Sequence, residues 1–288
     1  MQMDVLLAYG WQGLFLASWV GLAVGSFLNV VIYRLPVMLE REWRCQASEI
    51  LELPAPELEP QTFNLSVPRS RCPHCGHQIR WYENIPVFSW LVLRGRCSAC
   101  QAGISVRYPT VELATGILTL LVISNFGFTM FGLAAVVLTW YLIALTLIDF
   151  DTQLLPDQMT VPLMWFGLAY ATLGPAPLVT LTDAVIGAIV GYLSLWVVYW
   201  AFKLLTGKEG FGYGDFKLLA ALGAWLGWQV MPGLVLLSAI LGLVFALPGM
   251  LLGQVKAGKP IPFGPAIAVA GWLCLMFRDI ATSAIIPI

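Results

Sequence analysis

Long apolar segments separated by short polar turns make up most of the chain, and their lengths predict membrane-spanning helices. A helix needs about 20 apolar residues to cross the hydrocarbon core of a bilayer. Stretches without Asp, Glu, Lys or Arg that reach or approach this length are 5–33, 113–148, 158–182, 184–202, 218–255 and 261–277. Two of them are nearly twice as long as one helix requires, and each contains a glycine-bearing break, at 125–128 and at 227–233. The pattern therefore predicts about eight transmembrane helices.

The composition agrees with a polytopic all-α membrane protein. Of the 288 residues, 59% are hydrophobic and 11% are charged, whereas a soluble domain usually has about 25% charged residues. An ordinary water-soluble enzyme is thereby excluded. The net charge is −1 and the basic residues in the apolar half are scattered, so no surface that follows a phosphate backbone is expected, and no nucleic acid is expected as a partner.

The positions of Lys and Arg predict the orientation, because short loops rich in these residues stay in the cytoplasm. Residues 34–107 hold nine of the fifteen basic residues, and the loops at 203–217 and 254–262 hold five more. The turns that alternate with these loops hold none, and the 149–157 loop carries aspartates instead. Only Arg278 falls on the predicted outer side. Both termini are therefore expected in the periplasm, with the large polar segment in the cytoplasm.

These features divide the chain into three expected parts. They are a first transmembrane helix over 1–33, a cytoplasmic domain over 34–112, and a membrane-embedded domain of about seven helices over 113–288. A cleaved secretory signal would begin with positive charge and have a short apolar core. The first ten residues contain no Lys or Arg, so the first helix is expected to remain uncleaved. The acidic, proline-containing stretch 40–68 is expected to be a solvated loop.

Two Cys-x-x-C pairs in the cytoplasmic segment predict a metal site. The pairs are Cys72 with Cys75 and Cys97 with Cys100, and 21 residues separate them. Two such pairs suit tetrahedral zinc at nearly the spacing of zinc ribbons. Four thiolates close the coordination shell, so the expected role of the metal is structural, in a segment too small to fold around its own core.

Other interpretations of these cysteines stay open. Two disulfides would use the same residues, although disulfides are uncommon in the reducing cytoplasm. His74 and His77 lie within and beside the first pair, and either is an alternative ligand. Cys45 and Cys274 have no partner in this pattern and are expected to be inert.

Acidic residues at the ends of apolar runs are the candidates for catalysis, since an ionisable group there is costly. Asp149 directly follows the run that ends at Ile148, and Asp215 ends the sequence Gly212-Tyr213-Gly214-Asp215. Both lie on the predicted cytoplasmic side and can meet across the bundle. Two close aspartates do not both ionise readily, so one keeps a proton while the other activates a water against a peptide carbonyl. The glycines leave room for an extended peptide to approach.

The other acidic residues and the glycines have rival interpretations that follow from their positions in the sequence. Asp151 is the main rival to Asp149, but it lies two residues further toward water. Asp157 and Asp183 each stand at the start of a span and are expected to cap a helix N-terminus. The glycines between 207 and 214 do not follow a strand, which argues against a nucleotide-binding loop.

Several of these motifs together resemble one known family. The matching segments are Gly25–Pro36, the two Cys-x-x-C pairs, Tyr108-Pro109-x-Val111-Glu112, Asp149 with Leu154-Leu155-Pro156-Asp157, and the run from Gly207 through Gly210, Gly212 and Gly214 to Lys217. The chain resembles the bacterial type IV prepilin leader peptidases, which belong to the GxGD class of membrane aspartic proteases (peptidase family A24). The resemblance covers nearly the whole chain except the acidic stretch 40–68.

The resemblance implies a two-step enzyme of type IV pilus and type II secretion systems in the bacterial inner membrane. Such an enzyme cuts the leader peptide from prepilins and pseudopilins at the cytoplasmic face. It then methylates the new N-terminal amine with S-adenosylmethionine. The resemblance makes Asp149 and Asp215 the catalytic aspartates, but no residue of this sequence is assigned to S-adenosylmethionine.

Two alternatives to the bifunctional enzyme stay open at this point. One is a peptidase that does not methylate its product. The other is a transporter in which the carboxylates relay ions, as intramembrane carboxylates do in such proteins. The glycines beside Asp215 and the cysteine pairs favour the enzyme.

Overall fold

The computed structural model describes residues 2–54, 56, 62–207, 212–251 and 262–278. Within these residues the secondary structure is helical, and the only β-type pairings are two isolated bridges. The chain divides into two compact units, 1–124 and 125–288. Lys208, Glu209, Gly210, Lys256 and Lys259, which the charge and motif arguments use, lie outside the described residues.

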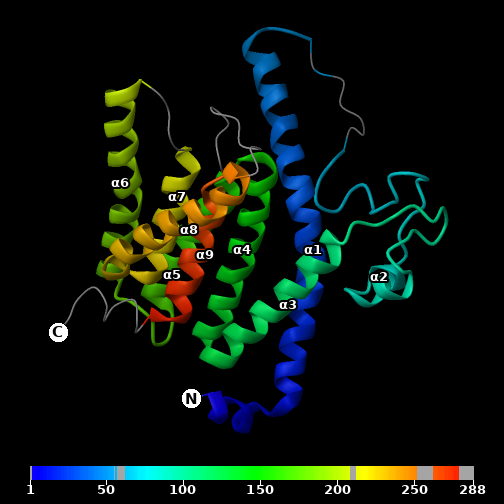
Figure 1. Ribbon diagram of the computed structural model, residues 1–288, viewed down its shortest axis with the longest axis horizontal. Helices are drawn as coiled ribbons and strands as arrows, with labels where there is room; N and C mark the ends of the chain where they lie inside the picture. Colours follow the sequence, from blue (N-terminus) through cyan, green and yellow to red (C-terminus); the bar gives the residue numbers. More distant parts are fainter. Residues whose placement is uncertain (1, 55, 57–61, 208–211, 252–261, 279–288) are drawn as a thin grey trace. The chain divides into compact units, whose positions relative to one another are not determined.

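The first unit contains one very long helix, two short helices and most of a fourth helix (Figure 1). Their bounds are α1 Gln2–Ile50, η1 Trp81–Asn84, α2 Phe88–Val92 and α3 Arg107–Phe126. Helix α1 is kinked at Gly10, where φ is 62°. Helices α1 and α3 approach closely through small residues: a Cβ on Gly25 would lie 2.7 Å from the Cα of Glu112. This contact fixes the start of α3 against the middle of α1.

The expected loop over 40–68 is wrong for its first part, because α1 continues to Ile50. Polar side chains one turn apart support this extension: Arg44 pairs with Glu40, and Gln46 donates to Glu42. Such pairs stabilise an exposed helix. The chain then returns to the helix at 64–68, where Arg34 donates to the carbonyl groups of Asn64 and Pro68 at 2.8 and 2.6 Å. Glu57 and Glu59 of this stretch lie outside the described residues.

The second unit is a bundle of helices. Their bounds are α4 Met130–Thr152, α5 Asp157–Leu173, α6 Leu181–Thr206, α7 Tyr213–Leu226, η2 Trp228–Val230, α8 Met231–Leu251 and α9 Gly264–Met276. Helices α6 and α7 cross almost backbone to backbone, since a Cβ on Gly223 would lie 2.0 Å from the carbonyl oxygen of Gly187. Small residues permit such close crossings in membrane proteins. Nearly every residue of α7 from Asp215 onward is buried, so α7 forms the centre of this unit.

Each apolar segment predicted from the sequence contains a helix. The described residues include five helices that are long and apolar enough to cross a membrane, and α9 is a shorter apolar helix. The predicted breaks are also found, because α3 ends at Phe126 and α7 ends at Leu226. Helix α7 has 14 residues, fewer than the roughly 20 that a span needs. The fold is thus that of an all-α polytopic membrane protein, in which α7 and α9, with 14 and 13 residues, are shorter than a full span.

Candidate active site and metal centre

Asp149 lies in the last turn of α4, which ends with Gln153 in the left-handed conformation. Its side chain is buried, at 5% exposure. Its Oδ2 accepts a hydrogen bond of 3.0 Å from the backbone N–H of Gly264, the first residue of α9. A carboxylate is favoured at a helix N-terminus because the unpaired N–H groups there carry partial positive charge. The start of α9 therefore holds the Asp149 carboxylate in place.

Asp215 is the third residue of α7 and is also buried, at 7% exposure. Its Oδ2 accepts a hydrogen bond of 3.2 Å from the backbone N–H of Gly212, which caps the same helix. Gly214, the residue before Asp215, lies against the same Leu155 side chain as Gly264, which binds the Asp149 carboxylate. The structure thus brings together the two aspartates that the sequence singled out.

Leu155 connects the segments that carry these two aspartates. A Cβ on Gly214 would lie 2.7 Å from the Cβ of Leu155, and a Cβ on Gly264 would lie 3.2 Å from its Cδ1. The end of α4, the start of α7 and the start of α9 therefore converge on one side chain. The two glycines are needed here because any side chain would displace Leu155 or the Asp149 carboxylate.

The rival aspartates occupy different surroundings. Asp151 is exposed on the last turn of α4. The N-cap interpretation is wrong for Asp157, because Pro156 is the N-cap of α5 and Asp157 follows it, paired at 2.7 Å with Lys217. It is also wrong for Asp183, because Thr180 caps α6 and the Asp183 carboxylate accepts from the indole N–H of Trp228. Both carboxylates are still in the first turn, where the helix dipole favours them.

The four cysteines of the two pairs come together in the first unit. Their sulfur atoms all lie within 4.8 Å of one another, with 3.8 Å between Cys72 and Cys100 and 4.0 Å between Cys75 and Cys97. Zinc–sulfur bonds of about 2.3 Å in a tetrahedron place the sulfurs about 3.8 Å apart. The thiols are free rather than joined in disulfides. The donor set and its spacing fit one zinc ion.

Both cysteine pairs adopt the same backbone turn, which is what presents their sulfurs to one point. In each turn the fifth residue has positive φ, 73° at Gly76 and 60° at Gln101, and donates its N–H to the carbonyl of the first cysteine. Backbone N–H groups of Cys75 and His74 lower the pKa of the Cys72 thiol to about 7. The pKa of the Cys75 thiol is instead raised to about 12 by the neighbouring Cys100 thiol and by burial, so a bound metal would have to displace the proton from this thiol.

Among the described residues, the metal-binding cluster includes neither His74, which is exposed, nor His77, nor the other two cysteines. His77 directs its Nε2 to Glu83 and Ser98, at 3.1 and 3.3 Å. Cys45 is exposed on α1, and Cys274 is buried in α9; both are free.

Sequence reasoning missed three residues of functional interest. Gly264 and Leu155 shape the aspartate cluster, and neither has reactive chemistry of its own. Glu112, quoted only as part of a motif, is buried in α3 and accepts a hydrogen bond of 2.6 Å from the backbone N–H of Val87. Its position as the sixth residue of the apolar helix α3 was the available signal, since a buried carboxylate there requires a partner.

The fold and the site together define a class of protein. Two buried carboxylates that converge inside an all-helical membrane bundle are the arrangement of a membrane-embedded aspartic protease.

Comparison with known proteins identifies the family within that class. Residues 19–126 match the bacterial peptidase A24 N-terminal domain, and residues 136–247 match the type IV leader peptidase family. The prepilin leader peptidase/N-methyltransferase of Stutzerimonas stutzeri is 56% identical over 264 residues, covering 92% of this chain and 90% of that protein. The protein of the same name from Pseudomonas aeruginosa is 54% identical over 259 residues, covering 90% of this chain and 88% of that protein. No solved structure matches the chain.

The chain belongs to the type IV leader peptidase family. It is therefore a peptidase and a multi-pass protein of the inner membrane.

Proposed function

We propose that this protein removes the leader peptide from type IV prepilins and pseudopilins and then methylates the new N-terminal amine with S-adenosylmethionine. The observation that carries the peptidase assignment is the convergence of the buried Asp149 and Asp215 carboxylates around Leu155. The names of relatives at 51–56% identity, which include both activities, support the methylation step.

In peptide hydrolysis, one carboxylate acts as the base and the other as the acid. A close pair of aspartates shares one proton, because two negative charges at short range repel each other. The ionised member takes a proton from water, which attacks the scissile carbonyl, while the protonated member donates to the carbonyl oxygen. One oxygen of each carboxylate is held by a backbone N–H, that of Gly264 or that of Gly212. These two bonds fix the carboxylates in orientation before the substrate arrives.

The proposed orientation places the aspartates at the cytoplasmic face and both termini in the periplasm. The nine arginines of residues 34–107 support it, because they belong to the polar segment that stays in the cytoplasm. A prepilin inserts with its basic leader on the same side. Enzyme and scissile bond then lie at the same edge of the bilayer.

Zinc is proposed to be structural. Cys72, Cys75, Cys97 and Cys100 would hold it, and four thiolates leave no open position for water or substrate. When bound, zinc would supply a crosslink between the two Cys-x-x-C turns. Residues 62–106 contain only the short elements η1 and α2 and isolated bridges, so their stability depends on such a crosslink.

The test uses purified protein in lipid nanodiscs with a prepilin substrate. Asp149→Asn and Asp215→Asn are each expected to lower the cleavage rate at least about a thousandfold, because removing one member of a catalytic unit removes most of its effect. Both variants are expected to methylate a peptide that has already been cleaved. Asp151→Asn is the matched control and is expected to cleave normally. Full cleavage by Asp149→Asn or by Asp215→Asn would refute the assignment. Ion flux through the unaltered protein in liposomes, without prepilin cleavage, would refute it as well.

A further inference from the structure

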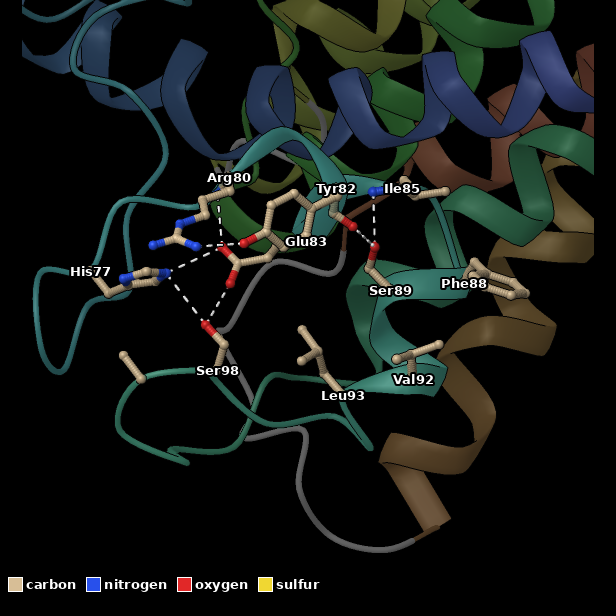
Figure 2. Close-up of a pocket in the computed structure, with 11 residues that line it drawn as sticks. His77, Arg80, Tyr82, Glu83, Ile85, Phe88, Ser89, Val92, Leu93 and Ser98 are labelled. Atoms are coloured by element: carbon tan, nitrogen blue, oxygen red, sulfur yellow. Dashed lines mark hydrogen bonds and ion pairs between the residues drawn. The ribbon is translucent and has the colours of Figure 1, made fainter.

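The first unit contains a cavity of about 690 Å³ that is separate from the cysteine cluster. It is an open cavity, and its lining comes from four parts of the first unit (Figure 2). The lining residues are His77, Arg80, Tyr82, Glu83 and Ile85, then Phe88, Ser89 and Val92 of α2, then Leu93, and finally Ser98 and Ala99 of the second cysteine turn. Pockets for small organic ligands usually measure about 300–1,000 Å³. The cavity is therefore large enough for a cofactor-sized molecule, and the hydrolytic mechanism above does not use it.

A buried carboxylate, that of Glu83, forms one wall of the cavity. Its side chain is 9% exposed. It accepts hydrogen bonds from the backbone N–H of Arg80 at 2.8 Å and from the hydroxyl of Ser98. These two donors lower the pKa of Glu83 to about 2, so the wall is negatively charged throughout the physiological pH range. A carboxylate offers about four acceptor positions. The contacts of Glu83 with Arg80, Ser98 and His77 occupy three of them, so one remains for a ligand.

A guanidinium group lies beside this carboxylate. Arg80 donates from Nη1 to the hydroxyl of Tyr82 at 2.6 Å, and its Cζ lies 5.9 Å from the centre of the Tyr82 ring. Figure 2 shows Arg80, Tyr82 and Glu83 next to one another at the same side of the cavity. This side can therefore hold a ligand that carries both a cationic and an anionic group.

The opposite side of the cavity is apolar. Phe88 and Val92 of α2 are 64% and 67% exposed, and Leu93 follows them. Figure 2 shows these side chains across the cavity from His77 and Glu83. Large apolar side chains left open to the solvent around a concave site are typical of ligand-binding walls.

The backbone that carries this apolar wall is held under strain. Val87, just before α2, has φ 59° and ψ −46°, a conformation that is costly for a β-branched residue. The buried Glu112 carboxylate accepts the Val87 N–H at 2.6 Å and so retains that conformation. A strained backbone conformation persists only where surrounding contacts hold it in place. Such conformations are frequent at ligand-binding sites. Glu112 thus fixes where α2 begins and where Phe88 points.

S-adenosylmethionine matches this distribution of groups. It carries a sulfonium, which suits the Glu83 carboxylate, a carboxylate, which suits the Arg80 guanidinium, and an adenine ring, which suits the apolar wall of Phe88, Val92 and Leu93. We propose that this cavity is the site where the protein binds S-adenosylmethionine for methyl transfer. The proposal rests on the methyltransferase activity proposed above.

The charge change in methyl transfer gives the proposal a specific signature. The lone pair of the neutral N-terminal amine attacks the methyl carbon, and the carbon–sulfur bond breaks with its electron pair moving to sulfur. The positive charge passes to the amine nitrogen, which then loses a proton to water. The leaving product, S-adenosylhomocysteine, is neutral at sulfur but otherwise alike. Glu83 is therefore expected to favour the methyl donor over the product, whereas the apolar wall is expected to hold both equally.

The experiment measures equilibrium binding of S-adenosylmethionine and S-adenosylhomocysteine to the full chain in nanodiscs. Glu83→Gln keeps the size and removes the charge. It is expected to weaken binding of the methyl donor about tenfold or more, as expected from losing the attraction between two opposite charges in a partly buried site, and binding of the product less than about threefold. Phe88→Ala is expected to weaken both ligands by similar factors. Glu49→Gln, an exposed change on α1, is the matched control and is expected to alter neither.

Each outcome bears on a different claim. Prepilin cleavage and zinc content should stay normal in both variants, because neither residue touches the aspartates or supplies a metal ligand. Unchanged affinity for the methyl donor in both variants would overturn the proposed site while leaving the methyltransferase function intact. Failure of the unaltered protein to methylate cleaved prepilin would instead overturn the proposed function. Should Glu83→Gln fail to fold, equal binding by Phe88→Ala and the unaltered protein would still overturn the site.

Discussion

Replacing Gly264 with alanine tests whether the start of α9 positions the Asp149 carboxylate, which we propose to be catalytic. A Cβ at this position would lie 2.7 Å from Oδ2 and 3.1 Å from Cγ of Asp149. An ordinary carbon–oxygen contact is about 3.3 Å, so the carboxylate must move by about 0.6 Å. Gly264 is not in the positive-φ region, so the backbone itself accepts alanine. The variant therefore displaces one carboxylate of the proposed catalytic pair without unfolding α9, because alanine has a higher helix propensity than glycine.

The expected effect on cleavage follows from the size of this shift. A misplacement of about 1 Å can cost about a hundredfold in rate, so about 0.6 Å is expected to lower the cleavage rate roughly tenfold, about 1.4 kcal/mol in activation free energy. The assay follows cleavage of a prepilin under saturating substrate in nanodiscs. Methylation of a cleaved peptide should not change. The control is Gly103→Ala, where a Cβ would meet nothing within 4 Å. Equal cleavage rates for Gly264→Ala and the control would refute the role of Gly264.

Two further predictions concern stability. One zinc per chain is expected by metal analysis, and a strong chelator should make residues 62–106 sensitive to protease; a metal-free, protease-resistant segment would contradict the structural role. Gly223→Ala should lower the unfolding free energy by about 1–3 kcal/mol, because its Cβ would lie 2.0 Å from the carbonyl oxygen of Gly187 and force α6 and α7 apart. Thermal unfolding in nanodiscs measures this, and an unchanged midpoint relative to Gly103→Ala would show that the two helices are not in backbone contact.

The helices were largely predictable because each apolar segment is a local signal. The breaks near Phe126 and Leu226 follow from glycine and polar residues within the segments themselves. The extension of α1 to Ile50 was not predicted, because the charged residues after position 40 suggested a solvated loop. In the structure some of them pair with each other along the helix surface instead. Charged composition alone does not separate a solvated helix from a solvated loop.

The site was predictable only in its reactive groups. Asp149 and Asp215 were singled out because a carboxylate next to an apolar run is costly. Gly264 is 115 residues from Asp149, and nothing local to either residue indicates their hydrogen bond. The place of Asp157 at the start of a span predicts an N-cap, whereas its actual partner, Lys217, is 60 residues away in the sequence. Contacts of this kind depend on packing across the bundle, which no hydropathy pattern encodes.

The central claim is that Asp149 and Asp215 act as one catalytic unit. The most direct test compares the prepilin cleavage rate of the double variant Asp149→Asn/Asp215→Asn with the rates of the two single variants in the same nanodiscs. Residues that act as a unit lose nearly everything with the first substitution, so the effects are not additive. We expect the double variant to cleave no more slowly than the slower single variant. A double variant whose loss equals the product of the two single losses would show that the two aspartates act independently.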